Sequence, residues 1–260
     1  MPSLLALAKA CEASYKNYPE LEGWSTLNYY GPRPSGFFGA LFRRQLEDGR
    51  FEIILAYRGT DGVLDGDMAS NHDILRGRMV RQFPDALAAL RDAITRTGPN
   101  YELYITGHSL GGGLAALCSM DKWRRGKALP TVTFNAPGLT ASARQLWGKT
   151  TSLYEREIRS SGLDAYMNDY RKALHVQVEG DPIAHFGTPT MRNLLTLPNL
   201  NCSNHPNQLT PSHIHANSNR DMAAQMLYNF TQTSLCAHSI RNLVSLLEKN
   251  PRYQEPIQWS

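Results

Sequence analysis

A serine between two glycines is the first residue of this chain whose setting suits chemistry. Residues 107–111 read Gly-His-Ser-Leu-Gly, which fits the pattern G-x-S-x-G with Ser109 at its centre. In this pattern the serine sits on a sharp turn between a strand and a helix, with its hydroxyl oxygen exposed. The flanks agree, because residues 101–106 suit a buried strand and residues 114–120 favour a helix. We therefore interpret Ser109 as a nucleophile.

A serine hydroxyl is a weak nucleophile until a base takes its proton, so Ser109 implies a histidine and an acid that orients it. We predict His238 as the base, because it lies at the start of a helix expected over residues 235–247, where a loop can hold an imidazole over strand ends. His108, inside the turn, is expected to point elsewhere, and His175 to lie within a strand. His72 precedes the serine, and four downstream histidines stay open as alternatives: His185, His205, His213 and His215.

Asp181 is the predicted acid. It follows the valine-containing run of residues 174–178, so its carboxylate is expected at the carboxyl end of a strand. Functional groups of open parallel sheets gather at this end. Glu179 is the alternative, whereas Asp164 and Asp169 fall in a helical stretch and are interpreted as surface charges.

The tetrahedral intermediate of acyl transfer carries an oxyanion that needs preorganised hydrogen-bond donors. One donor is normally the amide of the residue after the nucleophile, which here is Leu110. The second is expected from the turn after an earlier strand, and Arg58-Gly59-Thr60 follows the apolar residues 51–57. We predict the Thr60 amide as this donor; the alternative is an ordinary turn that ends a strand.

These residues need a sheet that brings strand ends together. Four apolar runs that end in polar turns are expected as strands: residues 51–57, 101–106, 131–134 and 174–178. Segments with apolar residues at helical spacing are expected as helices: residues 4–11, 83–94 and 235–247. The alternation predicts an α/β fold with a central, mostly parallel sheet flanked by helices. Residues 139–172, interpreted as helices, and residues 187–220, interpreted as a long surface loop, are expected insertions over the site.

Composition bounds the class of protein. A length of 260 residues without a linker or charge run fits one domain over residues 1–260. A charged content of 19% and the absence of a long apolar stretch are typical of a soluble globular protein. The net charge of +4 comes without a basic cluster, so nucleic acid is not an expected partner, whereas peripheral contact with a membrane is.

The N-terminus and the cysteines carry further expectations. The first residues lack the basic segment of a secretory signal, so we expect a cytoplasmic protein or one exported by a signal-independent route. The four cysteines are scattered without metal-ligand spacing, so neither a metal nor a cofactor is expected. Cys118 is expected to be buried, and pairing of Cys202 with Cys236 is left open.

Several separate segments together resemble the class 3 lipase family, the fungal-type triacylglycerol lipases. They are residues 56–60, 107–112, 134–138 and 180–182, followed by His238 in the same order as in the family. The resemblance implies an α/β-hydrolase fold and hydrolysis of lipid esters without a metal. It also implies a triad of Ser109, Asp181 and His238, with the amides of Thr60 and Leu110 as the oxyanion hole.

Some features depart from the family. Members commonly carry an Asp-Trp pair shortly after the arginine-glycine turn, near the lid, where Asp67-Met68 stands here. Residues 61–79 are rich in aspartate and arginine and make a poor apolar lid. The chain is more similar to the bacterial branch, whose members include phospholipases and antibacterial effectors delivered by contact-dependent secretion. By that analogy alone, a secretion-system or immunity protein would be a partner.

The favoured interpretation is a serine carboxylester hydrolase that acts on lipids through an acyl-enzyme, as a lipase or phospholipase. Phospholipid or monoacylglycerol is preferred to bulk triglyceride, because residues 61–79 are polar. One alternative is an esterase of small soluble esters, which a chain-length series would distinguish. The other is a catalytically inactive, hydrolase-like binding module, which would lack a triad residue, whereas every required residue type is present here in order.

Overall fold

The computed structural model describes residues 1–60, 80–97, 101–124, 129–138, 172–181, 183–184, 193–199 and 236–259. The expectations for residues 61–79 and 139–171 lie outside this part of the chain, as does most of the expected loop over 187–220. Individual residues named above that also lie outside it are His72, Asp164, Asp169, His185, Cys202, His205, His213 and His215.

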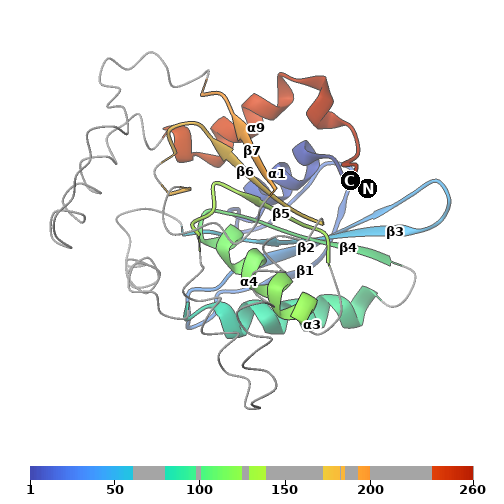
Figure 1. Cartoon of the computed structure of the whole chain (residues 1–260). Helices are drawn as coiled ribbons and strands as arrows, with labels where there is room; N and C mark the ends of the chain where they lie inside the picture. Colours follow the sequence, from blue (N-terminus) through green and yellow to red (C-terminus); the bar gives the residue numbers. More distant parts are fainter. Residues whose placement is uncertain are drawn as a thin grey trace, which may run out of the picture.

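Among the described residues, seven strands form one sheet in which the spatial order follows the chain order (Figure 1). The first three pair antiparallel: β1 (Ser25–Tyr30), β2 (Gly39–Gln45) and β3 (Phe51–Tyr57). From β3 onward all neighbours are parallel: β4 (Tyr101–His108), β5 (Thr131–Phe134), β6 (Ala173–Val178) and β7 (Leu194–Leu197). The predicted α/β-hydrolase architecture, with a mostly parallel sheet, is confirmed.

Helices cover both faces of this sheet. On one face lie α3 (Phe83–Thr97) and α4 (Leu110–Arg124); on the other lie α1 (Leu4–Ala13), α9 (Ile240–Glu248) and the short 3-10 helix η2 (Pro251–Gln254) (Figure 1). Successive residues of β3 enter opposite cores, since Leu55 packs with the α3 and α4 side and Ile54 with the α1 and α9 side. Burial on both faces explains why β3 reads as a mostly apolar run.

Four elements differ from expectation. β1 and β2 were not predicted, and β7 forms within residues that were interpreted as loop, because pairing with β6 supplies the hydrogen bonds that periodicity did not reveal. The last helix, expected over residues 235–247, begins at Ile240. Ser239 has an extended backbone and ends the preceding helical turn, so His238 lies before α9 rather than inside it.

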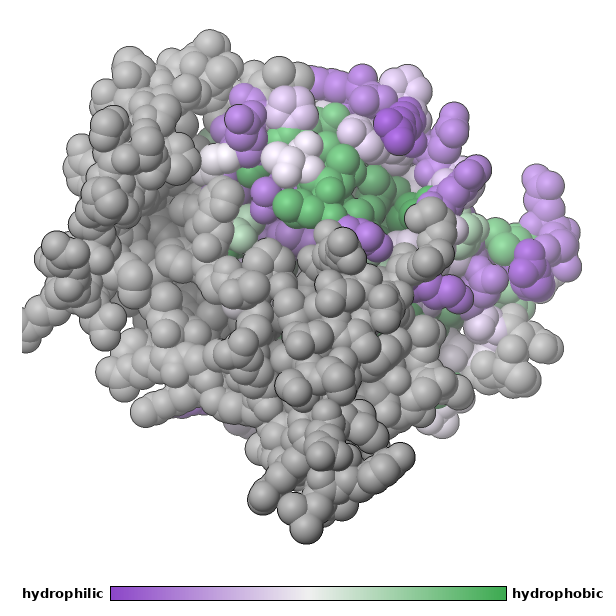
Figure 2. All heavy atoms as spheres, viewed as in Figure 1, coloured by the Kyte–Doolittle hydropathy of each residue, from purple (hydrophilic) through white to green (hydrophobic). Residues whose placement is uncertain are grey.

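β7 is the last strand in the order of the described part of the sheet. On the face drawn in Figure 2, hydrophobic side chains gather in the area where Figure 1 draws β7, with hydrophilic ones around them. Leu194 of this strand is 50% exposed. The strand is only four residues long, which limits pairing with another chain. Among the helices that the structure describes, none combines the length and the apolar character needed to cross a membrane.

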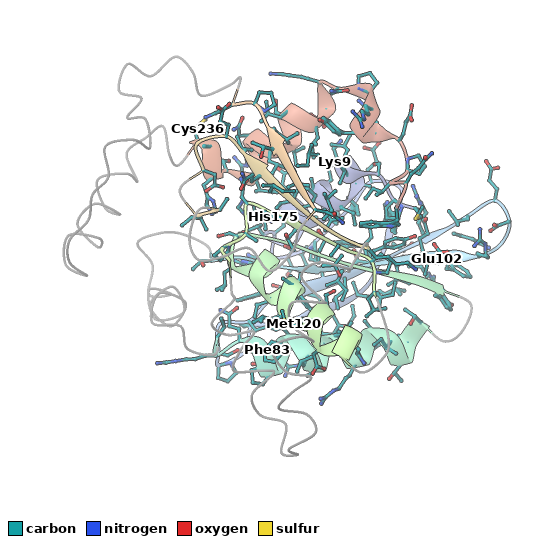
Figure 3. All side chains as sticks on the ribbon, viewed as in Figure 1. Lys9, Phe83, Glu102, Met120, His175 and Cys236 are labelled. Carbon is teal, nitrogen blue, oxygen red and sulfur yellow. The ribbon has the colours of Figure 1, made fainter. Side chains whose placement is uncertain are left out.

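The cysteines fall into two groups. Cys11 and Cys118 are free and fully buried, as expected for Cys118. Cys236 is disulfide-bonded and lies two residues before His238 (Figure 3). A disulfide therefore holds the chain close in sequence to the expected base.

Candidate active site

Ser109 occupies the tight turn that the sequence predicts between β4 and α4. Its φ of 55° is in the left-handed region, which costs energy for a residue other than glycine and here aims the side chain away from both elements. A Cβ on Gly107 would overlap the backbone of Gly111, and a Cβ on Gly111 would overlap the carbonyl of Tyr57. Only glycine at these two positions lets the strand and the helix pass so close to the turn.

The structure brings Ser109, His238 and Asp181 into one hydrogen-bonded line. His238 Nε2 lies 2.8 Å from Ser109 Oγ. His238 Nδ1 lies 2.9 Å from Asp181 Oδ2 and 3.1 Å from Oδ1. The serine follows β4, the aspartate follows β6, and the histidine precedes α9, so three distant parts of the chain meet at the carboxyl ends of the strands.

The partners fix where the protons lie in this line. A carboxylate only accepts hydrogen bonds, so the imidazole Nδ1 carries a hydrogen and donates it to Asp181. In the neutral imidazole Nε2 then has a free lone pair, and the Ser109 hydroxyl donates to it. This arrangement aims the serine proton at the nitrogen that can take it.

Asp181 is fully buried and is held by the backbone that follows it. Its Oδ1 accepts from the amide of Ile183 at 2.7 Å and from that of Ala184 at 3.3 Å. These bonds leave Oδ2 facing His238, whose side chain is 15% exposed. Glu179, the alternative acid, is exposed, and its amide pairs with the carbonyl of Leu197. The geometry therefore favours Asp181 as the orienting group.

The two residues expected to stabilise an oxyanion lie beside the serine in different ways. Leu110 is the first residue of α4 and is buried. The turn after β3 runs close to the serine, because a Cβ built on Gly59 would lie 3.1 Å from Ser109 Cβ. Thr60 follows Gly59 and is half-buried. The expected donor turn is therefore adjacent to the nucleophile.

Two further residues reach the backbone around the base, and their roles were missed from the sequence. His108 Nε2 lies 2.7 Å from the carbonyl oxygen of His238. Asn135, fully buried with a φ of 47°, donates from Nδ2 to the carbonyl of Ala237 at 3.1 Å. The sequence suggested that His108 points away from the site. Its ring nevertheless lies next to the ring of His238, with 4.9 Å between the two centroids. Their segments matched the family pattern, but nothing in the pattern indicated these contacts.

His175 is a structural histidine of β6, as its expected place in a strand suggests (Figure 3). Its Nδ1 lies 2.8 Å from the hydroxyl of Thr133 on the neighbouring strand. Burial lowers the pKa of His175 to about 4, although the Asp181 charge acts in the opposite direction. The imidazole is therefore neutral at neutral pH and links β5 to β6.

Comparison with known proteins points to lipid ester hydrolases. A protein of Mycosarcoma maydis named as a lipase, ATG15, is 27% identical over 187 residues, which cover 55% of this chain and 35% of the relative. An extracellular phospholipase A1 of Serratia liquefaciens is 29% identical over 132 residues, with coverage of 51% and 39%. The chain thus spans between a third and two fifths of the length of these curated relatives.

A solved structure and a family model complete the comparison. The Lip2 lipase of Yarrowia lipolytica is 15% identical, with a TM-score of 0.49 and coverage of 75% of this chain and 77% of that one. The model of a Tle-like phospholipase domain matches residues 11–199, which hold Ser109 and Asp181. Because that match includes more than half of the chain, this protein belongs to the phospholipase-like family defined by the Tle-like phospholipase domain.

Proposed function

We propose that this chain is a serine hydrolase of lipid esters and that its substrate is phospholipid. The observation that carries the proposal is the 2.8 Å contact between Ser109 Oγ and His238 Nε2, with Asp181 behind the imidazole. Membership of a phospholipase-like family supports the lipid substrate. The catalytic unit in this proposal is one domain over residues 1–260.

In the first half of the proposed reaction, Ser109 Oγ attacks the ester carbonyl carbon while His238 Nε2 takes the serine proton. Asp181 accepts the Nδ1 hydrogen bond and stabilises the imidazolium that forms. The carbonyl oxygen becomes an oxyanion, for which the amides of Leu110 and Thr60 are the proposed donors. Collapse of the intermediate breaks the ester bond, and His238 returns the proton to the leaving alcohol.

In the second half, water repeats the attack on the acyl-enzyme. His238 takes a proton from the water, whose oxygen adds to the acyl carbonyl. Collapse of the second intermediate releases the fatty acid and gives the proton back to Ser109 Oγ. The cycle needs no redox step, and each transferred proton passes through His238 Nε2.

Substitution of Asp181 by asparagine tests whether this residue sets the tautomer of the His238 imidazole, in a variant that is expected to fold. The side-chain oxygen of asparagine can still accept from Ile183 and Ala184, which leaves its NH₂ group facing His238 Nδ1. That group donates, so the imidazole proton moves to Nε2 and the serine loses its acceptor. We expect kcat on phospholipid vesicles to fall by about 10⁴-fold. A thermal melt close to that of the wild type is the control, and a folded variant with a normal rate would remove Asp181 from the triad.

The substrate proposal predicts a preference between two lipid surfaces. The family match favours phospholipid, and the polar residues 61–79 argue against strong activation by an oil phase. We expect higher initial rates on vesicles of long-chain phospholipid than on a triolein emulsion with matched acyl chains. The positive net charge adds the expectation that anionic vesicles are better substrates at low salt, through peripheral membrane contact.

Two other results would change this assignment. A sharp rise in rate when the triolein emulsion forms would replace phospholipid by triglyceride. A preference for short soluble esters would favour an esterase. Labelling by an alkyl fluorophosphonate tests the hydrolase proposal itself, because only an activated serine reacts, and an unlabelled wild-type chain would indicate an inactive binding module.

A secretion-system or immunity-protein partner stays a prediction by analogy.

A further inference from the structure

A chain of side-chain hydrogen bonds connects three parts of the candidate site. The amide of Gly59 donates to Tyr15 Oη at 3.2 Å, and Tyr15 Oη lies 2.9 Å from His108 Nδ1. On the other side of the ring, His108 Nε2 lies 2.7 Å from the carbonyl oxygen of His238. The chain thus runs from the turn beside the proposed oxyanion donor, through the residue before the nucleophile, to the backbone of the base.

Only one arrangement of hydrogens satisfies this chain. The His238 carbonyl accepts, so His108 Nε2 carries a hydrogen and donates it. Burial holds the pKa of His108 well below its usual range, and the adjacent His238 ring lowers it further. The imidazole is therefore neutral, Nδ1 accepts from the Tyr15 hydroxyl, and that hydroxyl accepts from Gly59. Every polar group in this series of hydrogen bonds has a partner.

The environment keeps Tyr15 and His108 in the protonation states that these hydrogen bonds need. Burial also raises the pKa of Tyr15, so its hydroxyl stays protonated and able to donate. The Arg58 guanidinium lies over the Tyr15 ring at 5.7 Å from its centroid, and the ring meets His108 edge-on. Because the His108 imidazole stays neutral, its ring does not repel the positive charge that develops on His238 during the reaction.

Asn135 holds the neighbouring carbonyl in the same way. Its Nδ2 donates to Ala237, while its Oδ1 accepts from the amide of Val178 at the end of β6. Two successive carbonyls before α9 are therefore held by side chains from the end of β4 and from the residue after β5. Of these two side chains, it is His108 that is linked, through Tyr15, to the turn after β3.

We propose that His108, oriented by Tyr15, is a positioning residue that holds the His238 backbone so that Nε2 stays aimed at Ser109. It acts through the main chain of the base and through the Gly59 turn, without touching the substrate. The inference rests on the proposed function. A displacement of about 1 Å of a reacting group can cost about 10²-fold in rate, so a contact of this kind affects kcat more than KM.

Two substitutions of His108 separate its two hydrogen bonds. The terminal amide of glutamine reaches about as far as Nε2 and can donate to the His238 carbonyl, whereas that of asparagine reaches only as far as Nδ1. We expect His108→Asn to lower kcat on phospholipid vesicles by about 10²-fold, with KM within about threefold of the wild type. His108→Gln is expected to recover kcat to within about tenfold of the wild type. The rate of inactivation by a fluorophosphonate should follow kcat in both variants.

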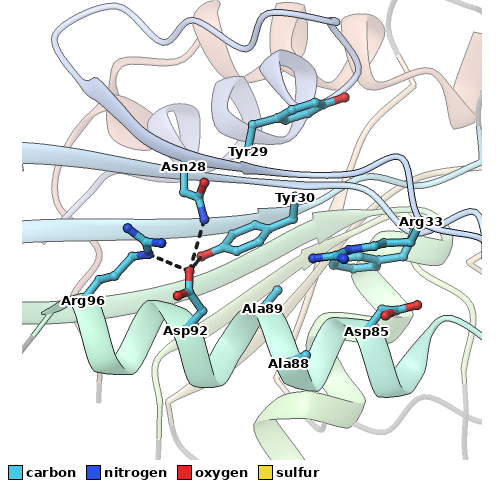
Figure 4. A pocket seen from close by; sticks show the side chains of 10 residues that line it. Asn28, Tyr29, Tyr30, Arg33, Asp85, Ala88, Ala89, Asp92 and Arg96 are labelled. Atoms are coloured by element: carbon cyan, nitrogen blue, oxygen red, sulfur yellow. Dashed lines mark hydrogen bonds and ion pairs between the residues drawn. The ribbon is translucent and has the colours of Figure 1, made fainter.

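Tyr15→Phe, with Tyr30→Phe as its matched control, tests the other end of the chain. Tyr15→Phe removes one hydroxyl from the chain and is expected to lower kcat by about tenfold. Tyr30 is a buried tyrosine of β1, three strands away from β4 in the sheet, whose hydroxyl donates to Asp92 at 2.8 Å in a pocket between β1 and α3 (Figure 4). Tyr30→Phe therefore loses a comparable bond, and we expect its kcat to equal that of the wild type.

The outcomes distinguish this inference from the proposed function. A wild-type chain that the fluorophosphonate does not label contradicts the proposed function. A labelled wild type, together with a folded His108→Asn that keeps kcat, overturns the positioning role alone. Equal losses in the asparagine and glutamine variants also overturn it, because the bond to the carbonyl would then not be the cause. If His108→Asn does not fold, equal kcat in Tyr15→Phe and Tyr30→Phe has the same meaning.

Discussion

Replacement of Ser109 by alanine is expected to lower kcat for phospholipid hydrolysis by about 10⁶-fold. The hydroxyl oxygen supplies the atom that bonds to the acyl carbon, and no neighbouring group can supply it instead. Ser109 is half-buried, and its structural role lies in its backbone, whose amide pairs with the carbonyl of Phe134. Alanine keeps that amide, so folding should survive the change.

Initial rates on anionic phospholipid vesicles measure this effect, with a thermal melt as the folding control. The same variant should also resist labelling by an alkyl fluorophosphonate. A folded Ser109→Ala chain that still turns over at a rate near the wild type would place the reaction at another site.

Replacement of His238 by alanine is expected to be nearly as severe, at about 10⁶-fold in kcat. Without the imidazole, Ser109 loses the acceptor at 2.8 Å, and Asp181 stays buried without its partner. The backbone carbonyl of residue 238 remains available to His108, so the turn before α9 keeps that contact. The loss should therefore be chemical rather than structural.

The other downstream histidines provide the matched controls for this experiment. Alanine variants at 185, 205, 213 and 215 should each keep most of the rate on the same vesicles. If one of them proved to be the severe variant, the base would have to be assigned to that histidine.

The sequence predicted best those elements that are buried on both faces. β3 and β5 have the predicted bounds, because nearly every side chain in them is buried between two helix layers. β1 was missed because its side chains are mostly half-buried or exposed and carry no apolar period. β7 was missed because its register with β6, rather than its own composition, makes it a strand.

In the candidate site too, some residues could be predicted from local sequence patterns and others could not. Ser109, Asp181 and His238 could be named because each has a local signal, namely a glycine-flanked turn, a strand end or a position before a helix. The partners of His108 had no such signal, since Tyr15 is 93 residues away and His238 is 130 residues away. Contacts over such distances are decided by how the helices pack on the sheet, and local patterns do not contain that information.

The order in which the site is completed follows from its position in the chain. Ser109 and Asp181 lie within residues 11–199, whereas the base comes from the turn just before α9, a helix that packs against α1. A nascent chain on the ribosome therefore holds the nucleophile and the acid long before it holds the base. Since domains fold as the chain emerges, the proposed hydrolysis starts only after α9 has left the ribosome and docked.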